Sequence, residues 1–274
     1  MSSKNKEIFT ASKTFEKLFS AKPYKIGLAL SGGGIKGMCH AGALKALEEN
    51  SIKPDIISGV SAGAIVAALY ADGHSPDEIG KIFEHIEFRK MTKLQRPSGG
   101  FFTTKPFERF LGSKLRAKTF EELQIPIRIV ATNLDTGQIE IFTKGNLLEA
   151  AMASSTVPVL FNPKIINGNH YVDGGVLKNF PVSTIRDDCE KVIGINASPM
   201  TTAEYKKSVM GIAMRTYHFM FKSNILNDKA LCDVLIEPVD VGNYEMFETD
   251  KSREIFDLGY NTAKKIFKMK DFSK

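Results

Sequence analysis

The serine at position 61 stands in a context that favours nucleophilic chemistry. It lies in Gly59-Val60-Ser61-Ala62-Gly63, which follows a short apolar run at 55–58 and opens an apolar helical pattern at 62–70. A strand, a G-x-S-x-G turn and a helix form a nucleophile elbow, in which Gly59 and Gly63 allow a tight turn that exposes Ser61. The helix start adds N–H groups and a dipole that favour developing negative charge. The alternative is a helix start that carries serine and glycine without chemistry.

A glycine-rich loop precedes this motif. A buried-strand pattern at 25–30 runs into Ser31-Gly32-Gly33-Gly34-Ile35-Lys36-Gly37, and a helical pattern follows. Consecutive glycines leave backbone N–H groups unshielded, so the loop suits an oxyanion in a hydrolase or a pyrophosphate in a dinucleotide-binding protein. The second interpretation needs an acidic residue at the end of the next strand. Asp55 lies before that strand and the serine turn lies at its end, so the dinucleotide-binding α/β protein is the less favoured alternative.

A serine nucleophile needs a base, and in an ordinary α/β-hydrolase an acidic residue and then a histidine follow the serine in the sequence. Asp173 precedes Gly174 and Gly175, after a short strand pattern at 164–166 and a turn. Among the five histidines only His218 follows Asp173, and it lies in an apolar helical run. A histidine there is expected on a helix face or in the core, whereas catalytic residues concentrate on loops. An Asp-Gly turn without chemistry is the alternative for Asp173.

In this order the motifs resemble the patatin-like phospholipase family. They are G-G-G-x-[RK]-G at 32–37, G-x-S-x-G at 59–63 and D-G-G at 173–175, with a small-residue helix end, a proline and an aromatic at 151–163. The resemblance covers about 24–185. It implies a catalytic dyad in which Ser61 is the nucleophile and Asp173 the base, with no histidine.

The same resemblance implies roles for the glycines. The N–H groups of Gly32, Gly33 and Gly34 are expected to form an oxyanion hole, and such donors are each worth roughly 3–4 kcal/mol in known enzymes. Lys36 either binds a phosphate-bearing substrate or braces the loop. The other motif glycines are expected to support the turns; they are Gly37, Gly59, Gly63, Gly174 and Gly175.

The composition agrees with an α/β protein. The chain has 274 residues, of which 43% are hydrophobic and 25% charged, as expected for a globular protein with a sizeable core. Strand patterns alternate with helical ones, so we expect a mostly parallel central sheet covered by helices on both faces, a three-layer α/β/α fold. The strands at 127–133 and 138–142 are expected to form a hairpin. Later elements are expected as strands at 191–196 and 233–236 and a helix at 251–267.

The predicted organisation has two parts. An N-terminal amphipathic segment covers 1–23, and a single patatin-like α/β hydrolase domain covers 24–274 with its motif-bearing core at about 24–185. The stretch 90–106 contains two glycines followed by two phenylalanines. It is interpreted either as a mobile loop near the cleft or as a packed connection.

Charge and cysteine content define the expected surroundings. Cys39, Cys189 and Cys232 form neither a disulfide framework nor a zinc pattern, and neither a metal nor another cofactor is expected. No secretory signal or membrane span is visible, so we expect a cytoplasmic location. The net charge is +6 with a basic excess at 251–274. These charges form a solvated surface or bind an anionic membrane, which would place the protein at the inner membrane surface.

The sequence therefore predicts a serine acyl hydrolase that cleaves carboxylic esters of lipids, as a phospholipase A, lysophospholipase or esterase does. Its expected partner is a lipid or small ester substrate, and no nucleic-acid motif is visible. The alternative is a patatin-like protein that binds acyl chains or a partner in a regulatory role with little catalysis. Head group, acyl length and oligomeric state are left open.

Overall fold

The computed structural model describes residues 21–84, 86, 92–94, 99–199, 205 and 207–269. The predicted amphipathic segment at 1–23 lies outside these ranges except for 21–23. None of the helices in the described ranges is both long enough and apolar enough to cross a lipid bilayer.

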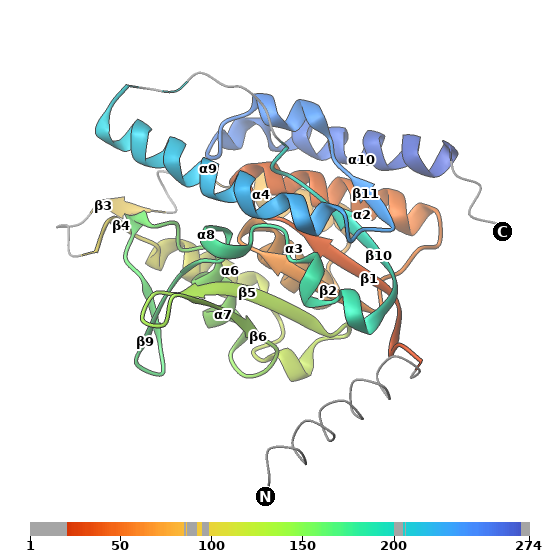
Figure 1. Ribbon diagram of the computed structural model, residues 1–274, viewed down its shortest axis with the longest axis horizontal. Helices are drawn as coiled ribbons and strands as arrows, with labels where there is room; N and C mark the ends of the chain where they lie inside the picture. The colour runs from red at the N-terminus through yellow and green to blue at the C-terminus, as the bar shows by residue number, and fades with distance from the viewer. Residues whose placement is uncertain are drawn as a thin grey trace, which may run out of the picture.

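An eight-stranded sheet forms the middle of the protein (Figure 1). Neighbours in the row β11-β10-β1-β2-β5 are parallel, whereas β6 and β9 pair antiparallel with β5, and β8 pairs antiparallel with β9. The mostly parallel sheet and the hairpin of β5 and β6 are as predicted. The strand bounds are β1 Tyr24–Leu30, β2 Ile56–Val60, β5 Ile127–Asn133, β6 Gln138–Phe142, β8 Lys164–Ile166, β9 Asn169–Asp173, β10 Cys189–Ile195 and β11 Val234–Ile236.

Helices cover both faces of this sheet because alternate strand residues enter two different cores. In β1, Leu28 and Leu30 belong to a large core shared with α2, α3, α4, α6, α7 and α10, whereas Ala29 belongs to a smaller core that contains Ile225 of α9. This arrangement confirms the predicted three-layer α/β/α fold. The helix bounds are α2 Met38–Glu49, α3 Ala62–Ala71, α4 Pro76–Glu84, α6 Lys105–Lys114, α7 Leu147–Ser154, α8 Gly175–Lys178, α9 Val209–Lys229 and α10 Ser252–Met269.

A second, three-stranded sheet lies beside the main one. Its order is β3-β4-β7, with bounds Lys93–Leu94, Gly100–Thr103 and Val159–Phe161. Most of the described residues of the stretch 90–106 therefore lie in strands or in the start of α6, which favours the packed connection over a loop for these residues. Residues 90, 91 and 95–98 lie outside the described ranges. Short 3-10 helices complete the fold, at η1 Gly34–Gly37, η2 Phe120–Glu122, η3 Val182–Thr184, η4 Arg186–Asp188, η5 Val239–Asn243 and η6 Thr249–Lys251.

Local capping defines where the helices near the site begin. The Asn146 side chain accepts a hydrogen bond from the N–H of Glu149 at the start of α7 (3.0 Å). The Ser208 hydroxyl likewise accepts from the N–H of Gly211 at the start of α9 (3.1 Å). Each side chain satisfies a helix donor that would otherwise lack a partner.

Strand register brings the motifs to one place. β2 pairs with β5 at Val60–Val130, and β5 pairs with β9 at Ala131–Asp173. The ends of β2 and β9 therefore lie level on the two sides of β5. β2 extends to Val60, two residues beyond the end that the sequence pattern indicated, and Ser61 follows at once.

Candidate active site

Ser61 lies in a strained turn between β2 and α3. Its φ of +53° and ψ of −122° place a non-glycine residue in an unfavourable backbone conformation at the N-cap of α3. Such strain costs about 1–3 kcal/mol and persists only where the surrounding packing enforces it. A Cβ at Gly59 would lie 2.6 Å from the Gly63 carbonyl oxygen, and one at Gly63 would lie 2.6 Å from that of Ser31. Only glycine fits at these positions, so the turn has the geometry of a nucleophile elbow.

Ser154, at the end of α7, fixes this turn from the other side. Its hydroxyl accepts a hydrogen bond from the Ser61 N–H at 2.8 Å and donates one to the Val130 carbonyl at 2.6 Å. Its own carbonyl accepts from the Gly174 N–H at 3.4 Å. Ser154 is fully buried. It therefore links the nucleophile, the central strand β5 and the turn that follows Asp173.

Asp173 is the last residue of β9 and is fully buried. Its N–H donates to the Thr156 carbonyl at 2.8 Å, and its Oδ1 accepts from the Gly175 N–H at 2.8 Å. The second glycine of the motif thus positions the carboxylate. Oδ2 has no hydrogen-bond partner in the described part of the chain.

The electrostatic state of Asp173 suits a base. Burial raises the pKa of Asp173 from 3.8 to about 6, while the Ser61 hydroxyl, the Gly175 N–H and the Tyr217 hydroxyl act in the opposite direction. The Ser61 hydroxyl therefore lies close enough to act on the carboxylate. A base works best when its pKa lies near the operating pH, because it is then deprotonated and still basic. The structure therefore brings the side chains of Ser61 and Asp173 together.

The glycine-rich loop after β1 faces the same turn, but its three glycines differ. The Gly32 N–H donates to the Asn179 carbonyl at 3.0 Å. Gly32 is therefore unavailable as an oxyanion donor, which corrects the prediction for this residue. In the described ranges the N–H groups of Gly33 and Gly34 donate to no protein group. Gly34 has a φ of +62°, which glycine adopts without strain.

Buried polar contacts make the loop rigid. The Ser31 hydroxyl accepts from the Ala197 N–H at 2.8 Å, and the Ser198 hydroxyl donates to the Gly32 carbonyl at 2.7 Å. His40 is fully buried, and burial lowers its pKa to about 4, although the contact with Ser31 raises it. The ring is neutral at pH 7, and its Nε2 donates to the Ser31 carbonyl (2.8 Å). A preorganised loop stabilises an oxyanion without reorganising during the reaction.

A mainly apolar cavity adjoins the site. Its volume is about 770 Å³ when the open solvent at its mouth is included. Ser61, Gly34 and Ser155 supply polar atoms to its wall, together with three threonines. The rest of the lining is apolar and comprises Ile35, Ala62, Ile65, Phe83, Ile86, Phe107, Val157, Phe161, Met246 and Phe247.

The remaining predicted residues support the fold around the site. Lys36 lies in η1, is 9% exposed and does not line the cavity. Of the two roles that the sequence left open, its position favours bracing the loop. A Cβ at Gly37 would lie 2.6 Å from the Cβ of Ala62. Gly37 therefore allows η1 to pack against the start of α3, beside Ser61.

The candidate histidine lies apart from this arrangement. His218 is half-buried on α9, with its ring centroid 6.1 Å from that of Phe221. His218 is not among the groups that shift the pKa of Asp173, whereas its neighbour Tyr217 is. Sequence reasoning overlooked Tyr217 and gave no role to Ser154. The only sequence signal for Ser154 was its place in the small-residue block at 151–163.

Comparison with known proteins shows the family to which this chain is related. A model of the patatin-like phospholipase family matches residues 28–185. Protein R571 of Acanthamoeba polyphaga mimivirus, named as uncharacterized, is 35% identical over 189 residues, which cover 61% of this chain and 64% of that protein. The human patatin-like phospholipase domain-containing protein 6 is 25% identical over 283 residues, covering 88% of this chain and 20% of that protein. The chain therefore spans less than two thirds of the first relative and a fifth of the second.

The fold has a solved counterpart. The crystal structure of VipD from Legionella pneumophila matches with a TM-score of 0.58 at 16% identity, covering 91% of this chain and 68% of that chain. The family match extends over more than half of this chain and includes the glycine-rich loop, the serine elbow and the aspartate turn. The chain therefore belongs to the patatin-like phospholipase family.

Proposed function

We propose that this protein is a serine hydrolase that cleaves carboxylic esters of lipids with a Ser61–Asp173 dyad. One observation carries the proposal. The Ser61 hydroxyl acts on a fully buried carboxylate with a raised pKa, at the wall of an apolar cavity. Perturbed carboxylates in a cleft are typical of catalytic sites. Membership of a phospholipase family supports the same chemistry.

In the proposed acylation step, Asp173 accepts the Ser61 hydroxyl proton while Oγ attacks the ester carbonyl carbon. The tetrahedral intermediate then collapses, the bond to the leaving alcohol breaks, and Asp173 returns the proton to that alcohol. In deacylation a water molecule repeats the sequence, so the acid is released and Ser61 is restored. Asp173 thus serves as base and acid in turn.

The oxyanion of each intermediate is proposed to face the N–H groups of Gly33 and Gly34. Both belong to a loop that is fixed by buried hydrogen bonds. Removing one such donor costs about 3–4 kcal/mol of transition-state stabilisation in known enzymes. The start of α3 directly after Ser61 adds a favourable helix dipole.

The apolar cavity is proposed to bind the acyl chain, since burying hydrocarbon is favourable by roughly 0.8 kcal/mol per CH₂. Contact with an anionic membrane surface is also proposed, because basic residues outnumber acidic ones at 251–274.

Hydrolysis of p-nitrophenyl esters of increasing chain length, and of phosphatidylcholine and its lyso form, tests this function. Ser61→Ala and Asp173→Asn are expected to lose activity by orders of magnitude. Ser113→Ala and Asp240→Asn, which alter exposed residues on α6 and η5, serve as matched controls. If the wild-type protein binds the acyl ligands without hydrolysing any ester, the non-catalytic alternative is correct. A fully active Ser61→Ala protein refutes the nucleophile.

A further inference from the structure

Two complementary polar atoms are buried beside each other without a hydrogen-bond partner. Within the described ranges, Oδ2 of Asp173 and the hydroxyl oxygen of Tyr217 lack one. The first atom only accepts when the carboxyl is ionised, and the second carries a donor. A buried polar group without a partner costs about 1–3 kcal/mol. Such a pair in native proteins calls for an explanation, and each atom can satisfy the other.

Each of the two side chains changes the pKa of the other. The Tyr217 hydroxyl is one of the groups that oppose the effect of burial on Asp173. Burial raises the pKa of Tyr217 well above its usual range, and the nearby Asp173 carboxylate raises it further. Tyr217 therefore keeps its proton at neutral pH. It is a permanent donor next to the free carboxylate oxygen.

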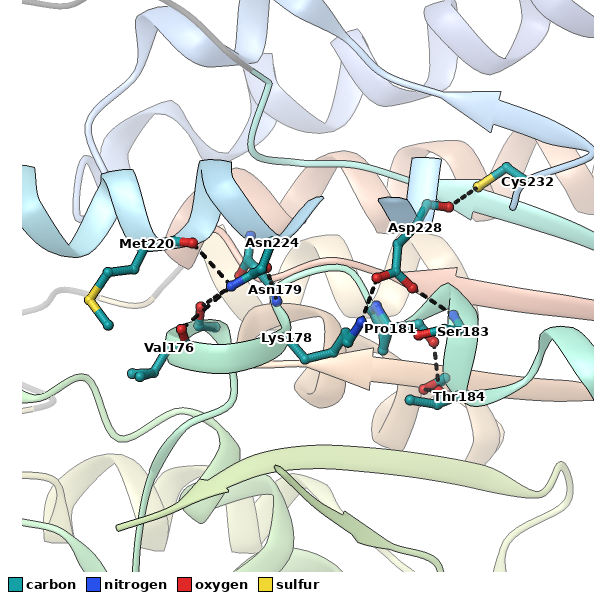
Figure 2. A network of polar contacts seen from close by, with 12 residues as sticks. Val176, Lys178, Asn179, Pro181, Ser183, Thr184, Met220, Asn224, Asp228 and Cys232 are labelled. Carbon is teal, nitrogen blue, oxygen red and sulfur yellow. Dashed lines mark hydrogen bonds and ion pairs between the residues drawn. The ribbon is translucent and has the colours of Figure 1, made fainter. Parts of the chain in front are cut away.

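The helix that carries Tyr217 is attached to the segment after Asp173 (Figure 2). The Asn224 side chain of α9 donates to the Gly175 carbonyl at 3.1 Å and accepts from the Asn179 N–H at 2.8 Å. One turn later, Asp228 forms an ion pair with Lys178 at 2.7 Å and accepts from the Ser183 N–H at 2.6 Å. These contacts fix the register of α9 against α8. A Cβ at Gly175 would meet the Phe221 ring, so α9 packs directly on the turn that follows Asp173.

Apolar neighbours keep other donors away from this pair. Tyr217 belongs to a buried cluster, and its ring centroid lies 4.3 Å from that of Phe221. Val157, Phe161 and Met246 belong to the same cluster and also line the cavity beside Ser61. In such surroundings a hydrogen bond to a charged group is stronger than in water.

We propose that Tyr217 is a positioning residue of the active site, whose hydroxyl donates a hydrogen bond to Oδ2 of Asp173 and orients the carboxylate toward Ser61. This inference rests on the proposed hydrolase function. Oδ1 is bound by the Gly175 N–H, so the two donors together fix the plane of the carboxylate. Tyr217 transfers no proton: when Asp173 accepts the Ser61 proton, the phenol remains neutral and its hydrogen bond weakens.

The test compares Tyr217→Phe with Tyr260→Phe. The control also removes one phenolic oxygen next to a carboxylate, because the Tyr260 hydroxyl of α10 donates to Glu49 of α2 at 2.8 Å in an exposed hydrogen bond. In Tyr217→Phe, kcat is expected to fall about ten- to a hundredfold with little change in KM, as for a lost hydrogen bond to a charged group. The acid limb of the pH–kcat/KM profile is expected to move to higher pH, because a group that favours the ionised carboxylate is gone.

The groups that act on the Asp173 carboxyl in the described structure are the hydroxyls of Ser61 and Tyr217 and the Gly175 N–H. A shift of the acid limb in Tyr217→Phe is therefore traceable to the phenol. If Tyr217 only stabilises the fold, Tyr217→Phe changes the free energy of unfolding and leaves the pH profile of kcat/KM unmoved. Unchanged kcat and an unmoved acid limb in a folded Tyr217→Phe protein overturn the proposal.

Carbon-13 NMR of protein labelled at aspartate carboxyls gives a readout without substrate. The Asp173 resonance is identified by its absence in Asp173→Asn, and its titration midpoint is expected to rise in Tyr217→Phe but not in Tyr260→Phe. A raised midpoint in a protein that hydrolyses no ester supports the contact and refutes the proposed function. An unmoved midpoint refutes the contact itself.

Discussion

Replacing Asp173 with asparagine is expected to abolish catalysis and, at neutral pH, to stabilise the protein. The native carboxylate is fully buried, and one of its oxygens lacks a partner among the described residues. Asparagine has nearly the same shape and no charge to desolvate. Its Oδ1 keeps an acceptor for the Gly175 N–H, and its Nδ2 replaces the carboxylate oxygen that lacks a partner.

The size of the effect follows from the pKa. Asp173 has a pKa of about 6 in the folded protein against 3.8 for an unperturbed group. The folded state therefore binds this proton more tightly than the unfolded state does. Stability from this group is lost as pH rises from about 4 to about 6, and the loss amounts to about 3 kcal/mol. Asp173→Asn has no such proton to lose.

The assay is urea unfolding of wild type and Asp173→Asn across this pH range. The variant's advantage in the free energy of unfolding is expected to be about 2.4 kcal/mol larger at pH 7 than at pH 4, because the unfolded carboxyl is already partly ionised at pH 4. Comparing the variant's advantage at the two pH values cancels any pH-independent effect of the amide on stability. Asp240→Asn controls for the loss of one exposed negative charge.

If the wild type and Asp173→Asn show the same pH dependence, the carboxylate is not desolvated and the reasoning fails. A gain in stability together with lost activity would instead be the trade-off expected when a residue serves the reaction at the expense of the fold.

Three further predictions concern the surroundings of the dyad. Ser154→Ala removes a donor and an acceptor at once, so the free energy of unfolding is expected to fall by about 1–3 kcal/mol and kcat to fall with it; unchanged urea midpoints contradict this. Ile65→Phe narrows the cavity beside Ser61, so kcat/KM is expected to fall more for long-chain than for acetyl esters, and an unchanged ratio places the acyl chain elsewhere. In the wild type, kcat/KM is expected to be lost as pH falls below about 6, since protonated Asp173 cannot accept a proton; a midpoint near 4 contradicts a buried base.

Much of the fold could be predicted because its signals are local. Apolar runs that end in glycine turns mark β1 and β2, and the turn at 134–137 marks the hairpin. The antiparallel placement of β9 and the small sheet of β3, β4 and β7 have no such signal. These strands are short, and their pairing depends on tertiary contacts. Val159 adopts a φ of +71°. A β-branched residue rarely has a positive φ, so the sequence did not predict this conformation.

The residues of the candidate site likewise fall into those that the sequence indicated and those that depend on tertiary contacts. Ser61 could be singled out from its glycine neighbours between a strand and a helix, whereas Asp173 was proposed as the base only through the resemblance to the family. Tyr217 and Ser154 could not be singled out, because each is a polar residue within an ordinary helical pattern, and its role depends on what that helix packs against. Gly32 was assigned a donor role that its hydrogen bond to Asn179 excludes, since spacing cannot reveal which N–H of a glycine run is already used.

The rate at which a fluorophosphonate modifies Ser61, followed by mass spectrometry across pH, tests the dyad most directly. The reagent reports the nucleophile and its base without depending on which lipid is the substrate. The rate for the wild type is expected to rise as pH increases through about 6, and Asp173→Asn is expected to react orders of magnitude more slowly. Modification of Ser61 at the same rate in both proteins, or of another residue in place of Ser61, would contradict the account.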